Sequence, residues 1–348
     1  MRQLATLCVG LLLVTALAAP VAGQTGQSGE ATQNCSFPVT MTDATGTEIT
    51  LEERPERVTT TNPSAAQTMW EIGGRDQVVG LTQYASYLEG SESRTNVSAS
   101  FGVSVERVAG TNPDLVIAPN ASAGDVQGLR DAGLTVYHLP QATSIEDIRE
   151  KTTTVGRLTG NCQGAAETNT WMDANVETVR ELTSGIEDRP TVLYPLGGGY
   201  VAANSTFIDA VLSIAGTDNA ASEYGGYPQL NDETVLQMDP EILILTENSA
   251  GLAAAEPYAS TTAGQQNATV QVRVRDLNQP APRSVVNVLR SLTRQLYIGP
   301  DAVVTGQSDS ATATPTATTD GSGPGFTAVS AVVAAVVGSL LLRRRGRR

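Results

Sequence analysis

The stretch from Ser144 to Arg189 constrains the fold most, because two similar segments lie on either side of it. Its apolar residues recur at helical spacing in two runs that Gly160-Asn161 separates, and Ser144-Ile-Glu-Asp147 is typical of a helix start. A helix of more than about 20 residues spans about 30 Å, enough to connect two lobes. The stretch therefore predicts a helical connector, with an ordinary crossover helix inside one domain as the alternative.

The segments before and after this stretch repeat one pattern. Glu106-Arg-Val-Ala-Gly-Thr-Asn-Pro-Asp-Leu-Val-Ile117 corresponds to Glu233-Thr-Val-Leu-Gln-Met-Asp-Pro-Glu-Ile-Leu-Ile244, and Ile72-Gly-Gly-Arg-Asp76 corresponds to Ile214-Ala-Gly-Thr-Asp218. Strand-like runs alternate with helix-like runs in both segments, which is typical of parallel α/β sheets. We predict an α/β fold with two parallel-sheet lobes, joined by the long helical connector. The ligand cleft is expected between the lobes.

The individual elements follow from local patterns. Residues 39–43 and 47–51 alternate in polarity around a turn and predict a hairpin. Strands are expected at 57–61, 78–82, 114–118, 135–139, 191–196 and 269–274, and helices at 63–72, 105–109, 126–132, 207–215 and 284–296. Gly197-Gly198-Gly199 follows a strand but lacks the spacing of a phosphate-binding loop.

The chain is expected to have six parts. A basic start, an apolar run and small residues predict a signal peptide at 1–23. Residues 301–323 are rich in Thr, Ala and Ser and predict a flexible spacer. The expected order is signal peptide 1–23, N-terminal lobe 24–143, connector 144–189, C-terminal lobe 190–300, spacer 301–323 and a sorting signal at 324–348.

The charge balance narrows the function classes. The sequence has 36 acidic residues against 22 basic ones, and five of its arginines stand in the last six residues. An acidic surface repels the phosphates of nucleic acid, so a nucleic-acid partner is not expected. We interpret the acidity as solubility in concentrated salt, as in halophilic archaea, and an acidic secreted protein without a special habitat is the alternative.

Several features fit a glycosylated, oxidised, exported protein. Five Asn-x-Ser/Thr sequons are candidate glycosylation sites, and they are Asn34, Asn96, Asn120, Asn204 and Asn267. Cys8 leaves with the signal peptide, so Cys35 and Cys162 remain. A disulfide between these two is plausible in an oxidising compartment, and two separate thiols are the alternative.

The C-terminal tail carries its own signal. Pro324-Gly325-Phe326 precedes an apolar run at 327–342 and the arginines that begin at Arg343. The run covers about 24 Å, less than a hydrocarbon core of about 30 Å. The tail resembles the PGF-CTERM signal of archaeal surface proteins, which a membrane archaeosortase removes while a lipid is attached. A retained C-terminal membrane helix is the alternative, and either anchor places an exported body on the outer face of the membrane.

The sequence offers little catalytic chemistry. His138 is the only histidine, and neither mature cysteine belongs to a C-x-x-C pair. A zinc site of several His or Cys ligands is therefore excluded, as is a Ser-His-Asp hydrolase unless His138 serves it. We predict no metal site, no cofactor and no enzymatic activity, with an enzyme on a related two-lobed scaffold as the alternative. His138 is expected to pack or lie at the surface, although it could face the cleft.

Aromatic residues are few, yet several follow predicted strands. Tyr84, Tyr87, Phe101, Tyr200 and Tyr227 each stand where a strand-to-helix loop meets the expected cleft. Aromatic faces suit a large, partly apolar ligand. We predict that the five form a ligand-binding wall, while each taken alone could be an ordinary surface residue.

Residues 36–300 resemble class III periplasmic-binding proteins. The segments that carry the resemblance are Pro55-Glu-Arg-Val58, Asn62-Pro-Ser64, Val79-Gly-Leu-Thr-Gln-Tyr84, Val105-Glu-Arg-Val108, Pro113-Asp-Leu-Val-Ile117, Pro228-Gln229, Glu233 and Pro282-Arg283. These proteins are the substrate receptors of ABC importers for cobalamin, ferric siderophores and haem. The likeness is greatest to the cobalamin branch, in which residues matching Tyr84 and Tyr227 line the pocket, although that branch has tryptophans near Phe101 and at Tyr227.

The resemblance also implies partners. Glutamates at the positions of Glu106 and Glu233 dock on arginines of the permease dimer in this family, whereas here they could simply complement helix dipoles. The family often has Glu where this chain has Gln67. We predict a monomeric receptor for cobalamin or another corrinoid, with a ferric siderophore or haem as the next ligands. A surface-layer or adhesion protein without a small ligand is the alternative from another class.

Overall fold

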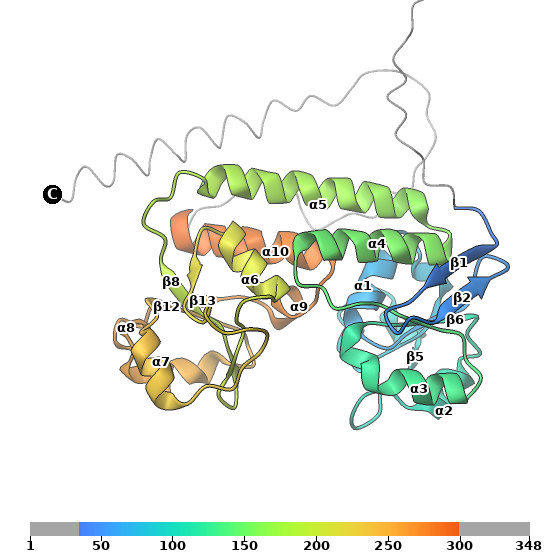
Figure 1. Cartoon of the computed structure of the whole chain (residues 1–348), viewed down its shortest axis with the longest axis horizontal. Helices are drawn as coiled ribbons and strands as arrows, with labels where there is room; N and C mark the ends of the chain where they lie inside the picture. Colours follow the sequence, from blue (N-terminus) through green and yellow to red (C-terminus); the bar gives the residue numbers. More distant parts are fainter. Residues whose placement is uncertain (1–34, 299–348) are drawn as a thin grey trace, which may run out of the picture. The chain divides into compact units, whose positions relative to one another are not determined.

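A computed structural model describes residues 35–298, all of which belong to one compact unit. The expected signal peptide, Asn34, the spacer and the sorting signal lie outside the described residues. Two parallel sheets form the centres of an N-terminal and a C-terminal lobe, which long helices connect (Figure 1). The predicted α/β fold class is confirmed.

The N-terminal lobe is built on a five-stranded parallel sheet. Its order is β5 (Thr95–Asn96), β4 (Val78–Leu81), β3 (Val58–Thr60), β6 (Leu115–Ala118) and β7 (Val136–His138). All four residues of β6 are buried, as expected of an inner parallel strand with an uninterrupted apolar run. The helices of this lobe are α1 (Pro63–Glu71), α2 (Val105–Gly110) and α3 (Ala123–Asp131).

An N-terminal hairpin, β1 (Val39–Thr42) and β2 (Glu48–Leu51), joins the first lobe. Asp43 at its turn is buried and accepts hydrogen bonds from the backbone N–H groups of Thr45 and His138. Arg130 of α3 pairs with the same carboxylate. The hairpin is thus attached to the lobe through the hydrogen bonds and the ion pair of the Asp43 carboxylate.

The C-terminal lobe repeats four of these strands. Its parallel sheet runs β11 (Asp218–Asn219), β8 (Thr191–Leu193), β12 (Ile242–Leu245) and β13 (Thr269–Gln271). The order corresponds to β4-β3-β6-β7 of the first lobe, as the internal repeat predicts. The helices are α6 (Phe207–Ile214), α7 (Asp232–Met238), α8 (Thr262–Gln265), α9 (Val274–Leu277) and α10 (Pro282–Thr293).

Single-turn helices fill many of the remaining connections. The 3-10 turns are η1 (Arg75–Gln77), η2 (Gln83–Ala85), η3 (Ser91–Ser93), η4 (Asn120–Ser122), η5 (Ala250–Ala254) and η6 (Tyr258–Ser260). A π-helical turn, η7 (Arg294–Ile298), extends α10.

Two strand predictions for the C-terminal lobe were wrong in extent. The strand expected at 191–196 ends at Leu193, and β9 (Pro195–Gly197) then pairs antiparallel with β10 (Tyr200–Val201). Gly197, Gly198 and Gly199 all have positive φ, which makes the tight turn possible. The strand expected at 269–274 ends at Gln271, and Val274 instead begins α9.

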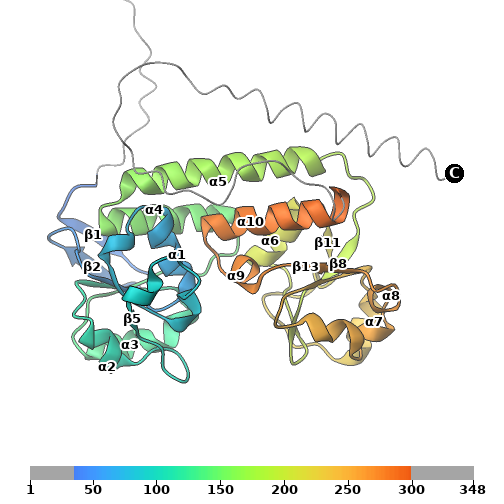
Figure 2. The same ribbon diagram turned by 180° about the vertical axis from the view of Figure 1, so that it is seen from behind.

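The connector consists of two antiparallel helices, α4 (Ile145–Thr159) and α5 (Cys162–Thr183). Ser144 and Asp147 form a capping box at the start of α4, and Gly160 ends it with φ +71°. Figures 1 and 2 both show α5 running across the two lobes. The helices contribute to both cores, with Ile148 packed in the C-terminal core and Leu158 in the N-terminal core.

A disulfide joins Cys35 to Cys162, so the first described residue is tied to the start of α5. The bond closes a loop across a sequence separation of 127 residues. The closed loop contains most of the N-terminal lobe, and the bond attaches the beginning of the described chain to the connector.

Candidate ligand-binding site

Two of the predicted aromatic residues are exposed on the N-terminal lobe. Tyr84 lies in η2, directly after the carboxyl end of β4, and 65% of its surface is exposed. Phe101 is 97% exposed in a loop that the Ser98–Val103 bridge closes. Gly102 has φ +68°, and an added Cβ would stand 2.6 Å from the Asp125 carboxylate, so the loop requires glycine next to Phe101.

The C-terminal lobe exposes its aromatic residues on a different scaffold. Tyr200 lies in β10, within the expected connection from strand β8 to helix α6, and this connection forms a short hairpin. Its neighbour Val201 donates a backbone hydrogen bond to Pro228, and Tyr200 itself bridges to Gln229. The segment that carries Tyr227 therefore lies beside β10, and Tyr200 and Tyr227 belong to one region.

Most of the exposed large hydrophobic residues in the described part of the chain are aromatic. These residues are Tyr84, Phe101, Tyr200, Tyr224, Tyr227 and Leu236. Tyr224 was missed by the sequence reasoning, although the spacing Tyr224-Gly-Gly-Tyr227 was a signal for it.

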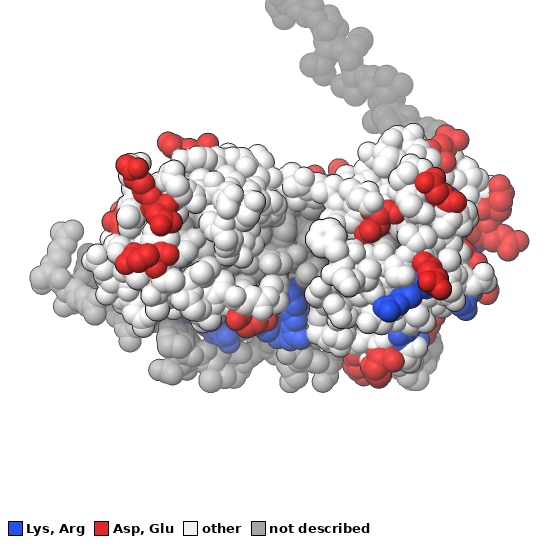
Figure 3. Space-filling model, turned by 90° about the horizontal axis from the view of Figure 1, so that it is seen from below, with Lys and Arg blue, Asp and Glu red and all other residues white. Residues whose placement is uncertain are grey.

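Figure 3 shows the face of the two lobes opposite α5. A furrow separates the lobes on this face, and basic side chains gather at one part of it, whereas acidic side chains are scattered over the lobe ends. The furrow is the feature that corresponds to the expected cleft.

Tyr87 lies between the lobes and is half-buried, so it differs from the exposed aromatic residues. The Arg275 guanidinium of α9 stands 5.4 Å from the centroid of its ring, and the Tyr87 hydroxyl donates to Gln67 Oε1 at 2.5 Å. Burial, followed by the charges of Glu71 and Asp276, raises the pKa of Tyr87. This predicted residue is therefore held in the contact between the lobes.

Glu71 at the end of α1 was not anticipated from the sequence. Its carboxylate accepts from Gln67 Nε2 at 2.7 Å and from the backbone N–H of Arg283 at 3.0 Å. The side chain keeps some exposed surface, but its carboxylate is enclosed, and this burial raises its pKa to about 7 against the lowering effect of these bonds.

The contact with Arg283 has a structural reason. Helix α10 begins at Pro282, and its N-cap residue Ala281 has no side-chain oxygen to satisfy the free N–H groups. Glu71 supplies that acceptor from the other lobe. A helix start without Ser, Thr, Asp or Asn was the sequence signal for this external cap.

Glu106 and Glu233 occupy matching positions in the first turns of α2 and α7, and both are exposed. Ser104 and Asn231 provide the capping hydrogen bonds of these helices. Glu106 forms no hydrogen bond or ion pair with any described residue, and Glu233 accepts only from Gln237, at 3.4 Å. Neither glutamate is thus the side chain that caps its helix.

His138 is buried at the end of β7, with Nδ1 2.9 Å from the Ala118 carbonyl oxygen. Between residues 35 and 298, no group of three or more His, Cys, Asp or Glu side chains could hold a metal ion. No helix in that range is apolar and long enough to cross a membrane. The sequons within it are exposed, namely Asn96, Asn120, Asn204 and Asn267.

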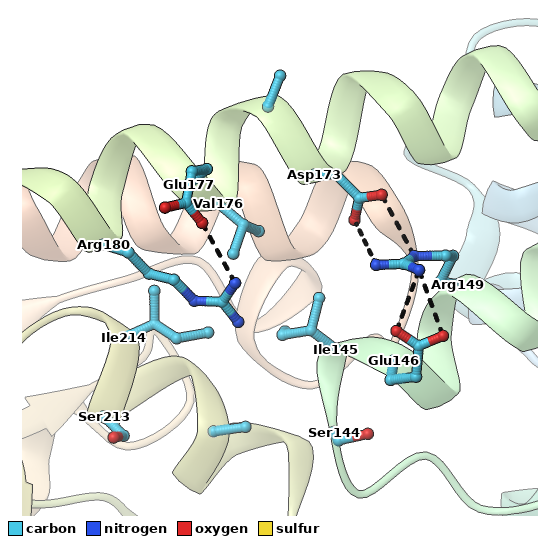
Figure 4. A pocket seen from close by; sticks show the side chains of 12 residues that line it. Ser144, Ile145, Glu146, Arg149, Asp173, Val176, Glu177, Arg180, Ser213 and Ile214 are labelled. Atoms are coloured by element: carbon cyan, nitrogen blue, oxygen red, sulfur yellow. Dashed lines mark hydrogen bonds and ion pairs between the residues drawn. The ribbon is translucent and has the colours of Figure 1, made fainter. Parts of the chain in front are cut away.

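A separate pocket of about 710 Å³ lies among α4, α5 and α6 (Figure 4). Its apolar lining includes Ile145, Val176 and Ile214, and ion pairs line its sides. Arg149 pairs with Glu146 and Asp173, while Arg180 pairs with Glu177. None of the predicted ligand-binding residues lines it, so it is distinct from the furrow.

Known proteins resemble this chain in sequence and in fold. The profile of the family described as "Periplasmic binding protein" matches residues 58–277. A "Cobalamin-binding protein" of Halobacterium salinarum is 42% identical over 306 residues, covering 83% of each chain. An uncharacterized ABC transporter substrate-binding lipoprotein, YvrC of Bacillus subtilis, is 26% identical over 220 residues, covering 61% of this chain and 70% of that protein.

Solved structures show the same fold at lower identity. The heme-binding protein HmuT superposes with a TM-score of 0.66 at 20% identity, covering 76% of this chain and 91% of HmuT. The apo form of the periplasmic heme-binding protein RhuT from Roseiflexus gives a TM-score of 0.62 at 23% identity, covering 68% of this chain and 98% of RhuT.

Proposed function

Because this chain belongs to the periplasmic binding protein family, we propose that it captures cobalamin or another corrinoid and delivers it to the permease of an ABC importer. The chain is a substrate-binding protein and not an enzyme, in keeping with its relatives. The relative with 42% identity is named for cobalamin, which makes a corrinoid the first candidate.

The observation that carries the proposal is the set of exposed aromatic residues on both lobes. Tyr84 and Phe101 belong to one lobe, and Tyr200 and Tyr227 belong to the other. A large macrocycle offers flat, partly apolar faces, and aromatic rings contact such faces favourably. A ligand held between the lobes would cover side chains that water now reaches.

A haem or a ferric siderophore is the second candidate. The half-buried Arg275 stands beside Tyr87 and would suit a chelate that carries acidic groups. The haem-binding neighbours support the fold alone, since their identity is about 20%.

Thermal unfolding in high salt separates these candidates. Cyanocobalamin, cobinamide, haem and two ferric siderophores would be added in turn to the purified protein. A ligand at about 100 times its dissociation constant stabilises the folded state by about 2.7 kcal/mol. We expect the largest rise of the midpoint with a corrinoid. No rise with any of the compounds would contradict the proposal and favour a surface-layer or adhesion role.

The aromatic site is tested by Tyr84→Ala combined with Tyr227→Ala. Loss of about 0.5–1.5 kcal/mol for each of the two aromatic contacts predicts binding of cyanocobalamin that is weaker by roughly tenfold or more, measured by calorimetry. Leu236→Ala is the matched control, because Leu236 and Tyr227 are both 42% exposed on the same lobe. Equal affinity of a folded double variant and this control would move the site elsewhere.

We further propose that Glu106 and Glu233 dock on arginines of a two-fold permease. Helices α2 and α7, which carry them, lie on the side of their lobes away from α5 (Figure 1). In molar salt the Debye length is about 3 Å, so only direct contacts can orient the complex. Truncation of one partner in a buried charge pair typically costs about 2–5 kcal/mol.

The double change Glu106→Ala with Glu233→Ala should therefore abolish uptake and leave ligand affinity unchanged. Glu150→Ala with Glu181→Ala removes two exposed carboxylates from the connector helices and is the matched control. Normal transport by the first variant, at normal surface levels, would show that the two glutamates only complement their helices.

The position at the cell surface is part of the same proposal. We propose an exported, glycosylated monomer that is adapted to high salt and anchored to the outer face of the membrane. Processing by an archaeosortase at the tail would leave a lipid anchor there. Intact-mass analysis of membrane-derived protein should find no peptide beyond about residue 325. Recovery of residues 343–348 would instead favour a retained helix.

A further inference from the structure

A continuous set of hydrogen bonds crosses from one lobe to the other. Tyr87 donates to Gln67 at 2.5 Å, and Gln67 Nε2 lies 2.7 Å from Glu71 and 2.9 Å from Ser284 Oγ. Glu71 accepts from the Arg283 backbone at 3.0 Å. Ser284 also donates to the carbonyl oxygen of Arg275, at 3.1 Å. Both members of the Tyr87–Arg275 pair are thus connected to the start of α10. We call this hydrogen-bonded set, which consists of Gln67, Glu71, Tyr87, Arg275, Arg283 and Ser284, the joint.

The charge of Glu71 determines the direction of these bonds. An ionised carboxylate can only accept, so it fixes Gln67 with Nε2 toward Glu71 and Oε1 toward Tyr87. A protonated Glu71 can donate, which allows the amide of Gln67 to rotate and present Nε2 to Tyr87. The hydroxyl proton of Tyr87 would then be free to point elsewhere.

The surroundings of Glu71 allow it to change charge near neutral pH. Burial raises its pKa to about 7, while Gln67, the Arg283 N–H and the Arg283 charge oppose that rise. Asp276 of α9 acts on Tyr87 and is itself held by Arg273 and Asn287. From α9, the charged Arg275 faces the Tyr87 ring. From α5, the Thr168 hydroxyl donates to the Glu71 carbonyl oxygen, and the Trp171 ring faces the Arg283 guanidinium.

We propose that Glu71 is a positioning residue of the ligand cleft, and that the proton it holds is linked through Gln67 to Tyr87 and to ligand binding. The inference rests on the proposed function, since Tyr87 affects binding only when a ligand occupies the furrow. A bulky ligand over Tyr87 and Arg275 excludes water from the joint, and desolvation favours the neutral carboxyl. Binding therefore takes up a proton.

The ligand-free protein provides the first test. In NMR spectra, the chemical shifts of the Arg283 amide and of the Tyr87 ring should change together as Glu71 titrates, with a midpoint near pH 7. Glu71→Gln should abolish both titrations. Gln67→Met keeps Glu71 but removes the hydrogen bonds between Glu71 and Tyr87. This variant should retain the pH-dependent shift of the Arg283 amide and lose that of the Tyr87 ring. This second variant decides the question if Glu71→Gln does not fold.

Calorimetry with cyanocobalamin provides the second test. Titrations in two buffers of different ionisation enthalpy should reveal proton uptake. The affinity for cyanocobalamin should be constant at pH values below the pKa of Glu71 in the free protein. Above that pKa it should fall, in total by about tenfold for each unit by which ligand binding raises the pKa of Glu71. Glu71→Gln should remove the pH dependence.

Glu167→Gln is the matched control. Gln163 donates to Glu167 at 2.8 Å on the exposed side of α5, and the two residues have the same four-residue spacing as Gln67 and Glu71. This control should keep the wild-type pH profile. A wild-type protein that binds cyanocobalamin without proton exchange would overturn the linkage, as would an unchanged profile in Glu71→Gln. If cyanocobalamin does not bind at any pH, the corrinoid proposal fails. If the Arg283 amide and the Tyr87 ring do not titrate together in the ligand-free protein, the proposed coupling of Glu71 to Tyr87 is overturned, whatever the ligand is.

Discussion

The N-terminal and C-terminal lobes share four strands in the same order but connect their first strand to their first helix differently. In the N-terminal lobe, β3 ends at Thr60 and α1 begins at Pro63. In the C-terminal lobe, β8 ends at Leu193 and the β9–β10 hairpin precedes α6. The hairpin carries Tyr200 and lies beside the segment of Tyr227. The comparison teaches that the repeat preserves the frame, while a hairpin inserted outside it adds Tyr200 to the aromatic residues of one lobe.

The lobes also differ in what secures them. The N-terminal lobe has the Cys35–Cys162 disulfide and the β1–β2 hairpin, both at its own boundary. The C-terminal lobe depends on its neighbour, because Glu71 of α1 caps its helix α10. We therefore expect perturbations of the two lobes to be separable except at this joint.

The largest separable effect should come from the connector. Ile148 and Leu158 are fully buried on α4, one in each core. Replacing either with alanine removes apolar contacts and leaves a cavity, which should cost about 2–5 kcal/mol. Hydrogen exchange should show lost protection mainly in β8 and β12 for Ile148→Ala, and in β3 and β6 for Leu158→Ala.

Glu150→Ala on the exposed side of α4 is the control, with an expected change within about 0.5 kcal/mol. Equal loss of protection in both lobes from each core variant would show that the lobes unfold as one unit, and would break the comparison.

The disulfide should give the next largest effect. Cys35→Ser combined with Cys162→Ser frees a long loop in the unfolded chain and should lower the free energy of unfolding by about 2–4 kcal/mol. Because the bond encloses the N-terminal lobe, exchange should increase there more than in β8 and β12. Reduction of the wild-type protein should reproduce the loss, and an unchanged unfolding curve after complete reduction would contradict it.

The joint should make stability depend on pH. The folded pKa of Glu71 lies near 7 and its ordinary value is 4.5, so the folded state keeps a proton that the unfolded chain has lost. The free energy of unfolding should therefore fall as pH rises from about 4.5 to about 7, by at most about 3 kcal/mol. Denaturation curves across this range should show the slope in the wild-type protein and not in Glu71→Gln.

The acid range reports other groups. Burial acts to raise the pKa values of Asp43 and Asp147, but hydrogen bonds outweigh it and lower them below their ordinary value of 3.8. Their contribution to the free energy of unfolding is present above that value and is lost as pH falls through the lowered pKa.

The Glu71 prediction has a clear contrary outcome. If the free energy of unfolding depends on pH in the same way for the wild-type and Glu71→Gln proteins between about pH 4.5 and 7, the joint does not titrate.

Turn glycines should give the smallest effects and sharpen the contrast between the two hairpins. Gly46 has φ +79° with open space around it, so Gly46→Ala should cost about 1 kcal/mol from backbone strain alone. Gly199 has φ +80°, and an added Cβ would stand 3.0 Å from the Leu230 carbonyl oxygen. Gly199→Ala should cost somewhat more in thermal unfolding and should also weaken binding of cyanocobalamin. Full affinity in this variant would remove the hairpin from the site.

Much of the frame could be predicted from local pattern. The buried run at 115–118, the capping box at Ser144 and the interruption at Gly160 each act within a few residues, so the sequence indicates them directly. Apolar spacing likewise identified two connector helices. The β9–β10 hairpin was missed because β9 has only three residues, and its pairing depends on a turn of three glycines rather than on an apolar period.

The sequence by itself determined the repeat, the helical connector and the residue types available for a ligand, because periodicity and composition are local properties. Only the tertiary structure decided that Tyr87 is held against Arg275 and that Glu71 caps a helix of the other lobe. Glu71 and Arg283 are 212 positions apart in the chain, and no local pattern fixes a contact over that distance. The burial that raises the pKa of Glu71 arises only when the two lobes pack, because desolvation depends on what surrounds a carboxylate rather than on its neighbours in sequence.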